Sequence, residues 1–266
     1  QFINFGSVAL STGRVNLRED TLAPGYVRRY VDVVTRDGEV VIDADGLNAD
    51  LIRLELIAKR VGIAGQITNA YTSPTATVRM VAGDSLAQFD TAASPTDNLT
   101  PWVYYQGGQA AVTGIAIDIA ASASVTSGRI EMLVTDQGAG VCNAGQLLAN
   151  AGDFVLTSSG QVEQQGGRIG AAGTVTVEAG AYTQSSRDGM RSQAVSGQRV
   201  HIRTTGDIVN NDGLIQGVAS TDSTLAYSVA LDAGGTIVNR TTAAGADADG
   251  AIIFGGDEDV SLKSGG

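Results

Sequence analysis

Ser85 has the most catalytic setting of any residue in this sequence, because it lies in a Gly-Asp-Ser-Leu run. A serine nucleophile needs a histidine nearby to take its proton. The chain of 266 residues has one histidine, His201, and the residue three positions before it is Gln198 rather than an aspartate that could complete the arrangement. We therefore interpret the run as coincidental. His201 is expected to face outward, because it alternates with apolar neighbours on a predicted strand.

Metal and redox chemistry have few possible ligands in this chain. One cysteine, Cys142, and one histidine cannot build the usual zinc site, and a single cysteine cannot form an intrachain disulfide. We expect Cys142 to be a small buried residue in a turn. The region 247–259 lacks the recurring glycines of calcium-binding repeats, so we expect a solvated acidic face, leave calcium binding open and expect no cofactor. Its acidic residues are Asp247, Asp249, Asp257, Glu258 and Asp259.

Trp102, Tyr104 and Tyr105 form an aromatic cluster that could contact a glycan or a protein partner. Aromatic residues on a strand more often pack on the body of the fold, so we favour packing and keep the contact as the alternative. Paired carboxylates could also cleave a polysaccharide. That chemistry depends on their separation across a groove, which a sequence does not give.

The composition excludes further classes of function. A formal net charge of −11 provides no basic field for a phosphate backbone, so no nucleic-acid partner is expected. The uncharged stretch 98–117 is interrupted by proline, glutamine and glycine, so no membrane span is expected. Charged residues make up 17% of the chain, and 35 residues are glycine. Typical domains have about 25% charged residues and about 7% glycine, so the glycine surplus needs an explanation.

The second half of the chain repeats a short pattern, in which an apolar-x-apolar pair precedes a glycine by three or four residues. The spacing between successive pairs lengthens from 21 to 31 residues. Alternation of this kind indicates strands, and a fixed phase of glycine indicates one turn per repeat. The five copies are Phe154 and Leu156 before Gly160, Val175 and Val177 before Gly180, Val200 and Ile202 before Gly206, Val229 and Leu231 before Gly235, and Val260 and Leu262 before Gly266.

These observations predict an all-β chain that forms a right-handed parallel β-helix, or solenoid. A sandwich or barrel is the alternative, but it would not require glycine at one phase of a repeat. The segment 51–61 is predicted as strand, and residues 71–101 as a hairpin or loop excursion. Insertions at 185–196, 218–224 and 240–249 are expected at one corner. The predicted structural turn positions, which need positive φ or close backbone approach, are Asn143, Gly145, Gly160, Gly180, Gly206 and Gly235.

Three blocks of the sequence resemble the secretion domain of two-partner-secretion exoproteins, the family of filamentous haemagglutinins and contact-dependent growth inhibition proteins. The first, 46–67, leads from a Gly-Leu turn into Leu-Ile-Ala-Lys and a strand. The second, 116–145, contains Ala-Ile-Asp, Gly-Arg-Ile, Thr-Asp, Gly-Ala-Gly-Val and Asn-Ala-Gly in the family's order. The third is the repeat region, which is similar to haemagglutinin repeats. The family's Asn-Pro-Asn motifs do not occur, so the chain resembles the later part of such a domain followed by its first repeats.

The resemblance implies two regions, 1–150 from the secretion domain and 151–266 with haemagglutinin-type repeats continuous with it. It also implies a non-enzymatic, secreted segment that serves outer-membrane export and presents an adhesin or a growth-inhibition effector at the bacterial cell surface. The implied partners are an outer-membrane transporter of the two-partner-secretion type and a receptor on a host or neighbouring cell, and we expect a monomer. A β-helical protein that binds or cleaves polysaccharide is the alternative.

Overall fold

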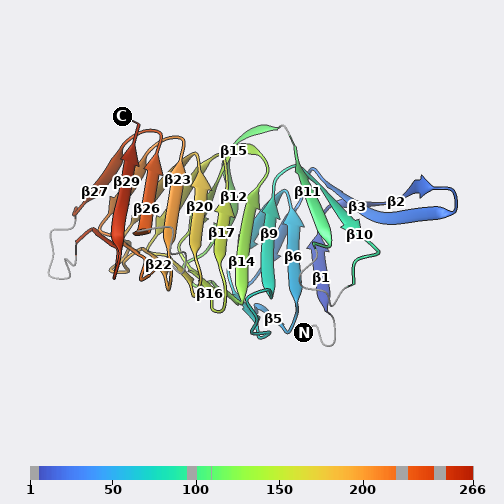
Figure 1. Ribbon diagram of the computed structural model, residues 1–266, viewed down its shortest axis with the longest axis horizontal. Helices are drawn as coiled ribbons and strands as arrows, with labels where there is room; N and C mark the ends of the chain where they lie inside the picture. The colour runs from blue at the N-terminus through green and yellow to red at the C-terminus, as the bar shows by residue number, and fades with distance from the viewer. Residues whose placement is uncertain (1–5, 95–100, 109, 220–226, 243–249, 266) are drawn as a thin grey trace.

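The computed structural model describes residues 6–94, 101–108, 110–219, 227–242 and 250–265. Three parallel sheets wind around a common axis, and Figure 1 shows their strands stacked side by side along the molecule. Each turn of the coil, or rung, contributes one strand to each sheet, so the predicted parallel β-helix is confirmed. Within the ranges described, no helix is long and apolar enough to cross a membrane.

The strands of sheet 1, in spatial order, are β1 (Ser7–Ser11), β6 (Arg53–Ala58), β9 (Thr77–Ala82), β14 (Arg129–Val134), β17 (Phe154–Thr157), β20 (Val175–Ala179), β23 (Val200–Thr204), β26 (Tyr227–Ala233) and β29 (Asp259–Ser264). Those of sheet 2 are β4 (Glu39–Ile42), β7 (Arg60–Ile63), β12 (Ala111–Ile119), β15 (Gln137–Asn143), β18 (Gln161–Gln165), β21 (Ala181–Ser185), β24 (Ile208–Asn211) and β27 (Ile237–Arg240). Those of sheet 3 are β5 (Leu47–Ala49), β8 (Gln66–Asn69), β13 (Ser124–Ser127), β16 (Gln146–Ala149), β19 (Arg168–Ala171), β22 (Gln193–Ser196), β25 (Leu214–Gln216) and β28 (Ile252–Phe254).

The predicted apolar pairs stack in register on sheet 1. Leu156 lies opposite Val177, which lies opposite Ile202, and Leu231 follows on the next rung. All four side chains are almost completely buried, because alternation turns every second residue of each strand into the coil. Burial of one such side chain stabilises the fold by about 1.5–3 kcal/mol, so each rung stabilises the next through its inner face.

The glycines of the repeat stack directly on one another at the corner after sheet 1. The amide of Gly180 donates to the carbonyl of Gly160 over 2.8 Å, and Gly206 and Gly235 continue the column with bonds of 2.7 and 3.0 Å. None of the four has a φ in the left-handed region, but a Cβ on Gly180 would lie 2.3 Å from the Ser159 carbonyl oxygen. The close approach of backbone from the adjacent rung therefore explains why these positions are glycine. Gly266 lies outside the described residues.

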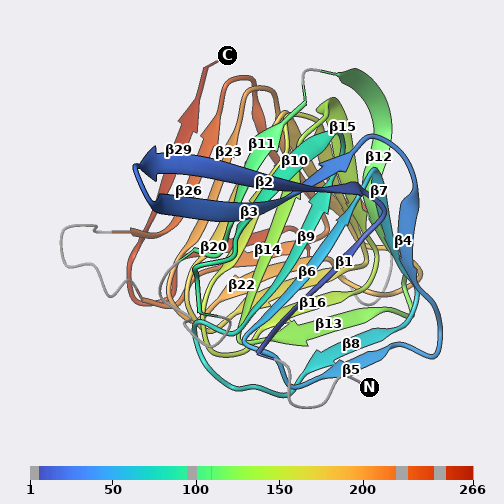
Figure 2. The same ribbon diagram turned by 90° about the vertical axis from the view of Figure 1, so that its right-hand side faces the viewer.

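A fourth sheet, here called the lateral sheet, lies outside the coil near its N-terminal end (Figures 1 and 2). It is antiparallel and contains β11 (Val103–Gly107), β10 (Ser85–Asp90), β3 (Tyr26–Thr35) and β2 (Arg14–Ala23), in that order. The prediction that 71–101 leaves the coil is wrong for β9, whose Val78 and Met80 are fully buried in the coil. The excursion includes β10 and also β11, which lies beyond residue 101, whereas residues 95–100 lie outside the described ranges. The sequence did not predict the hairpin β2–β3.

The segment 51–61 forms β6 and the start of β7, as predicted. All six residues of β6 are buried, because the lateral sheet covers the face that alternation turns outward. The prediction of insertions at a single corner is wrong. The segments 185–196 and 240–249 connect sheet 2 to sheet 3, whereas 218–224 lies between β25 of sheet 3 and β26 of sheet 1. Residues 220–226 and 243–249 lie outside the described ranges.

Replacing Gly180 by alanine is expected to lower the free energy of unfolding by about 1–3 kcal/mol, because the added Cβ would overlap backbone of the preceding rung. Urea denaturation measures the change. Gly107→Ala in β11 is the matched control, since its Cβ would meet Thr135 at an ordinary 3.5 Å. Equal stability of the two variants would contradict the role assigned to close approach.

Candidate functional site

The predicted aromatic cluster lies where the lateral sheet packs on sheet 1. Here a second hydrophobic core joins residues from the outer face of sheet 1 to residues of the lateral sheet. Its buried members are Val33, Ile57, Val81, Ala87, Phe89 and Val103. Trp102 packs edge-on against Phe89, with ring centroids 5.1 Å apart, and Trp102 and Tyr105 both pack against this core. These contacts hold the excursion against the coil.

A buried carboxylate lies beneath the two aromatic side chains. Glu55 of β6 is 1% exposed, and it accepts hydrogen bonds from the indole Nε1 of Trp102 (3.3 Å) and the hydroxyl of Tyr105 (2.7 Å). Arg79 of β9 pairs with Glu55 over 3.0 Å and with Glu131 of β14 over 2.6 Å. Three successive rungs and the lateral sheet thus share one ionic cluster. A buried charge is tolerated when it is paired and hydrogen-bonded in this way.

Burial shifts the titration of this cluster. It raises the pKa of Glu55, an effect opposed by Arg79 and the two aromatic donors. Burial and the Glu55 carboxylate raise the pKa of Tyr105, so its hydroxyl remains a donor. The contacts of Trp102 and Tyr105 fit the prediction from the sequence that the aromatic cluster packs on the body of the fold. Tyr104, by contrast, is 54% exposed, and the glycan or partner contact predicted for the aromatic cluster stays a prediction.

A second polar feature, which the sequence analysis missed, is a ladder of amide side chains inside sheet 2. Asn143 donates from Nδ2 to Oε1 of Gln164 (2.9 Å), and Gln164 donates in turn to Gln184 (3.4 Å). Gln184 donates to Asn210 (2.8 Å), and Asn210 donates to Asn239 (2.7 Å). The first four side chains are at most 1% exposed. Spacings of 21, 20, 26 and 29 residues follow the loose repeat, and this recurrence was the available signal.

Asn143 and Gly145, two of the predicted turn positions, lie at the start of this ladder. Oδ1 of Asn143 accepts the amide of Gly145 over 3.1 Å, while Nδ2 of Asn143 joins the ladder. A Cβ on Gly145 would lie 2.4 Å from the Ala123 carbonyl oxygen of the previous rung. The turn and the ladder therefore depend on the same asparagine.

The residues considered for catalysis or metal binding are not brought together. Ser85 is buried in the lateral sheet, and His201 lies on the outer face of sheet 1, 3.7 Å from Asp232. Cys142 faces outward from β15 and is partly exposed, so the expected burial is incomplete, and burial raises its pKa. No group of three or more His, Cys, Asp or Glu side chains suited to a metal occurs in the described parts of the chain. Asp247 and Asp249 lie outside them.

The comparisons with known proteins identify the family. The family model described as "TPS secretion domain" matches residues 1–164. The chain belongs to the two-partner-secretion (TPS) secretion domain family. Exoproteins of this family are exported across the outer membrane to the cell surface or secreted, and this is the location of the chain.

Two curated relatives match the TPS region. The chain is 28% identical over 166 residues to "tRNA nuclease CdiA-2" of Burkholderia pseudomallei (strain 1026b), and 28% identical over 167 residues to "Toxin CdiA" of Yersinia pestis. Each match covers 62% of this chain but only 5% and 4% of the relatives' own length. A crystal structure of the filamentous hemagglutinin secretion domain aligns with 21% identity and a TM-score of 0.37, over 89% of this chain and 60% of that chain.

The cluster beneath Trp102 and Tyr105 predicts a pH dependence of stability. Between the ordinary pKa of 4.5 and the raised value, the folded chain holds a proton on Glu55 that the unfolded chain has released. Stability relative to Glu55→Gln is therefore expected to fall as pH rises through this window and to level off above it. Urea denaturation over a pH series measures this difference. A stability difference that grows with pH would show that the ion pair with Arg79 outweighs the burial of Glu55. Glu19→Gln, with an exposed side chain, is the control.

The amide ladder predicts a large cost for a single apolar substitution. Gln184→Leu removes the acceptor of the buried Tyr182 hydroxyl (2.9 Å) and the donor to Oδ1 of Asn210 (2.8 Å), and one buried unsatisfied group costs about 1–3 kcal/mol. We expect the free energy of unfolding, measured by denaturation, to drop by at least that amount. Gln146→Leu is the control, because Gln146 is exposed on the outer face of β16. A ladder variant as stable as the control would mean that the ladder contributes nothing.

Proposed function

We propose that this chain is a non-enzymatic secretion segment whose rung-by-rung folding outside the cell advances the export of a longer exoprotein. The observation that carries the proposal is the pairing order of the three parallel sheets. Each coil strand pairs, within its parallel sheet, only with the strands of the rung before and the rung after. A chain that emerges unfolded and in sequence order can therefore complete one rung at a time.

The exposed edge of the last completed rung supports this mechanism. A strand edge presents unpaired N–H and C=O groups to the next segment that arrives. Each new rung adds three strands of parallel pairing and continues the buried columns. The resulting gain in free energy opposes return of the chain through the transporter. Folding by this route requires no disulfide, because the chain's single cysteine is free.

We further propose that the exported protein is a contact-dependent growth inhibition effector, with an adhesin as the second candidate. One curated relative is named a toxin and the other a tRNA nuclease, which favours the first. Because the matches cover only 4–5% of those relatives, a toxic activity would reside elsewhere in the exoprotein. This chain would export and hold such a domain at the surface, where a receptor on a neighbouring cell is the expected partner.

Leu156→Ala is expected to slow export of the full exoprotein through its transporter. Leu156 is 1% exposed in the inner face of β17, and its truncation typically costs about 2–5 kcal/mol. Pulse-chase labelling with surface protease accessibility measures the rate of appearance outside the cell. Leu17→Ala is the matched control, because Leu17 is 83% exposed on β2.

Two outcomes separate the parts of this proposal. Equal export rates for the Leu156 and Leu17 variants would reject folding as a contributor to export. Export that continues without the outer-membrane transporter would reject the secretion route itself.

A further inference from the structure

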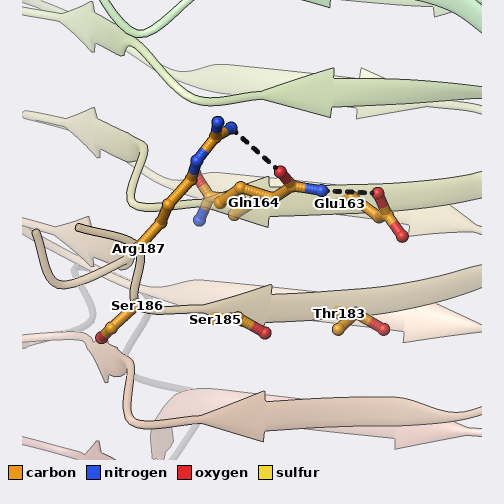
Figure 3. A pocket seen from close by; sticks show the side chains of 7 residues that line it. Glu163, Gln164, Thr183, Ser185, Ser186 and Arg187 are labelled. Carbon is orange, nitrogen blue, oxygen red and sulfur yellow. Dashed lines mark hydrogen bonds between the residues drawn. The ribbon is translucent and has the colours of Figure 1, made fainter.

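A shallow cavity of about 240 Å³ lies on the outer face of sheet 2, away from the lateral sheet. Figure 3 shows the side chains that line it, which come from β18, β21 and the segment that follows β21. They combine a carboxylate, amides, hydroxyls and a guanidinium, and all of them except the buried Gln164 are at least partly exposed. The partly or fully exposed lining includes Glu163, Gln165, Thr183, Ser185 and Arg187.

The cavity opens onto a polar column that runs along the coil. Gln165, Ser185, Asn211 and Arg240 occupy the same position on four successive rungs. Asn211 donates to the Ser185 hydroxyl over 3.2 Å, and Arg240 donates to Asn211 over 2.7 Å. One hydrogen-bonding side chain is therefore presented at every rung, with a spacing of about 4.8 Å between strands.

A second column, polar at one end and aliphatic at the other, lies beside the polar column. Thr183 stacks on Glu163 in the cavity, and Val209 and Val238 continue this second column on the next two rungs. The surface thus offers hydrogen-bonding groups along one line, and along the neighbouring line a carboxylate and a hydroxyl followed by two aliphatic groups. A ligand that fits both columns must combine hydrogen-bonding groups with an aliphatic face where it covers Val209 and Val238.

The cavity has a fixed side wall. After β21 the chain makes a tight turn in which Arg187 and Met190 exchange backbone hydrogen bonds of 2.9 and 2.8 Å. Asp188 and Gly189 have φ angles of 53° and 77° in this turn. The hydroxyl of Ser186 donates to the Asp212 carbonyl over 2.8 Å, and Arg187 donates to Gln165 over 3.3 Å. These bonds attach the wall to the coil.

Hydrogen-bonding capacity remains available in the cavity. Among the described residues, the hydroxyl of Thr183 has no hydrogen-bond partner. The two oxygens of Glu163 accept bonds from Gln161 (3.1 Å) and Gln165 (3.0 Å). A carboxylate can accept about four bonds, so Glu163 retains free lone pairs.

We propose that this surface binds a linear, neutral oligosaccharide that runs along the coil axis, with one sugar residue per rung. Sugar hydroxyls pair with the Thr183 hydroxyl and with the polar column from Gln165 to Arg240, and the aliphatic faces of the rings lie on Val209 and Val238. An extended β-1,4-linked chain advances by nearly one rung per sugar residue, which matches the repeat of the surface. The net charge of −11 disfavours acidic polysaccharides through overall repulsion.

An extended peptide fits this surface less well. Peptides that add to sheets pair with a free strand edge. Here β18, β21 and β24 are each paired on both sides, so the groove floor offers no such edge. The proposal is independent of the export function, because it concerns the outer face of the folded coil.

The test is a titration of the isotope-labelled chain with cellohexaose, followed by amide chemical shifts in NMR spectra. We expect saturable shifts on β18, β21 and β24. Maltohexaose, which has the same composition but a helical shape, is expected to bind more weakly. Thr183→Val is expected to weaken binding by about 2- to 12-fold, the equivalent of one neutral hydrogen bond.

Thr176→Val is the matched control, because Thr176 is a partly exposed residue on the outer face of β20 in sheet 1. Thermal unfolding of both variants shows whether the substitution alters the fold. Absence of saturable shifts, shifts confined to other faces, or equal binding by the two valine variants would overturn the proposal. Equal affinity for both hexasaccharides would overturn the extended arrangement, and saturation by an unrelated extended peptide at the same amides would overturn the assignment to sugar.

Discussion

Every rung of the coil is held by hydrogen bonds to the same positions one rung away, and this constraint determines what each position can contain. Where Gly180 donates to Gly160 at a corner, no Cβ fits between the two backbones. Where a side chain points inward, its neighbours are the equivalent side chains above and below. Leu156, Val177 and Ile202 therefore form one apolar column. A polar inner side chain must likewise find its partner in the adjacent rung, as the amide ladder does.

The lateral sheet is the exception to this pattern of contacts between adjacent rungs. It covers the outer face of several rungs, so outward side chains there are buried. Outward residues such as Glu55 and Ile57 would be exposed on a bare coil, but here both are fully buried. Ile57 contributes to a second core, and Glu55 retains its place through Arg79, Trp102 and Tyr105. One ionic cluster thus joins segments that are 47 and 50 residues apart in the chain.

The sequence allowed the second half of the fold to be predicted because each strand there buries one face, so the period of two and the phased glycines are visible. Around β6 and β9 both faces are buried, the alternation disappears, and the excursion was misplaced. The hairpin β2–β3 had a local signal, Pro24-Gly25 between two alternating runs, with Gly25 at a φ of 80°. The partners of Glu55 could not be predicted, because no local pattern specifies which distant strand covers it. The boundary at residue 150 stays a prediction.

The direction of the amide ladder bears on how register is maintained as rungs are added. From Asn143 to Asn239, the amide nitrogen of the earlier rung always donates to the oxygen of the later one. A growing end therefore presents an unpaired donor until the next rung arrives. A strand that arrives one residue out of register would turn its amide side chain outward and place a normally exposed side chain inside the coil. The waiting donor would then be buried without an acceptor, which costs about 1–3 kcal/mol. Apolar columns also resist a one-residue slip, but they resist a two-residue slip less, since another aliphatic residue can then fill the space. The ladder thus supplies the register information that leucine and valine columns lack, in a fold whose loops vary in length from rung to rung.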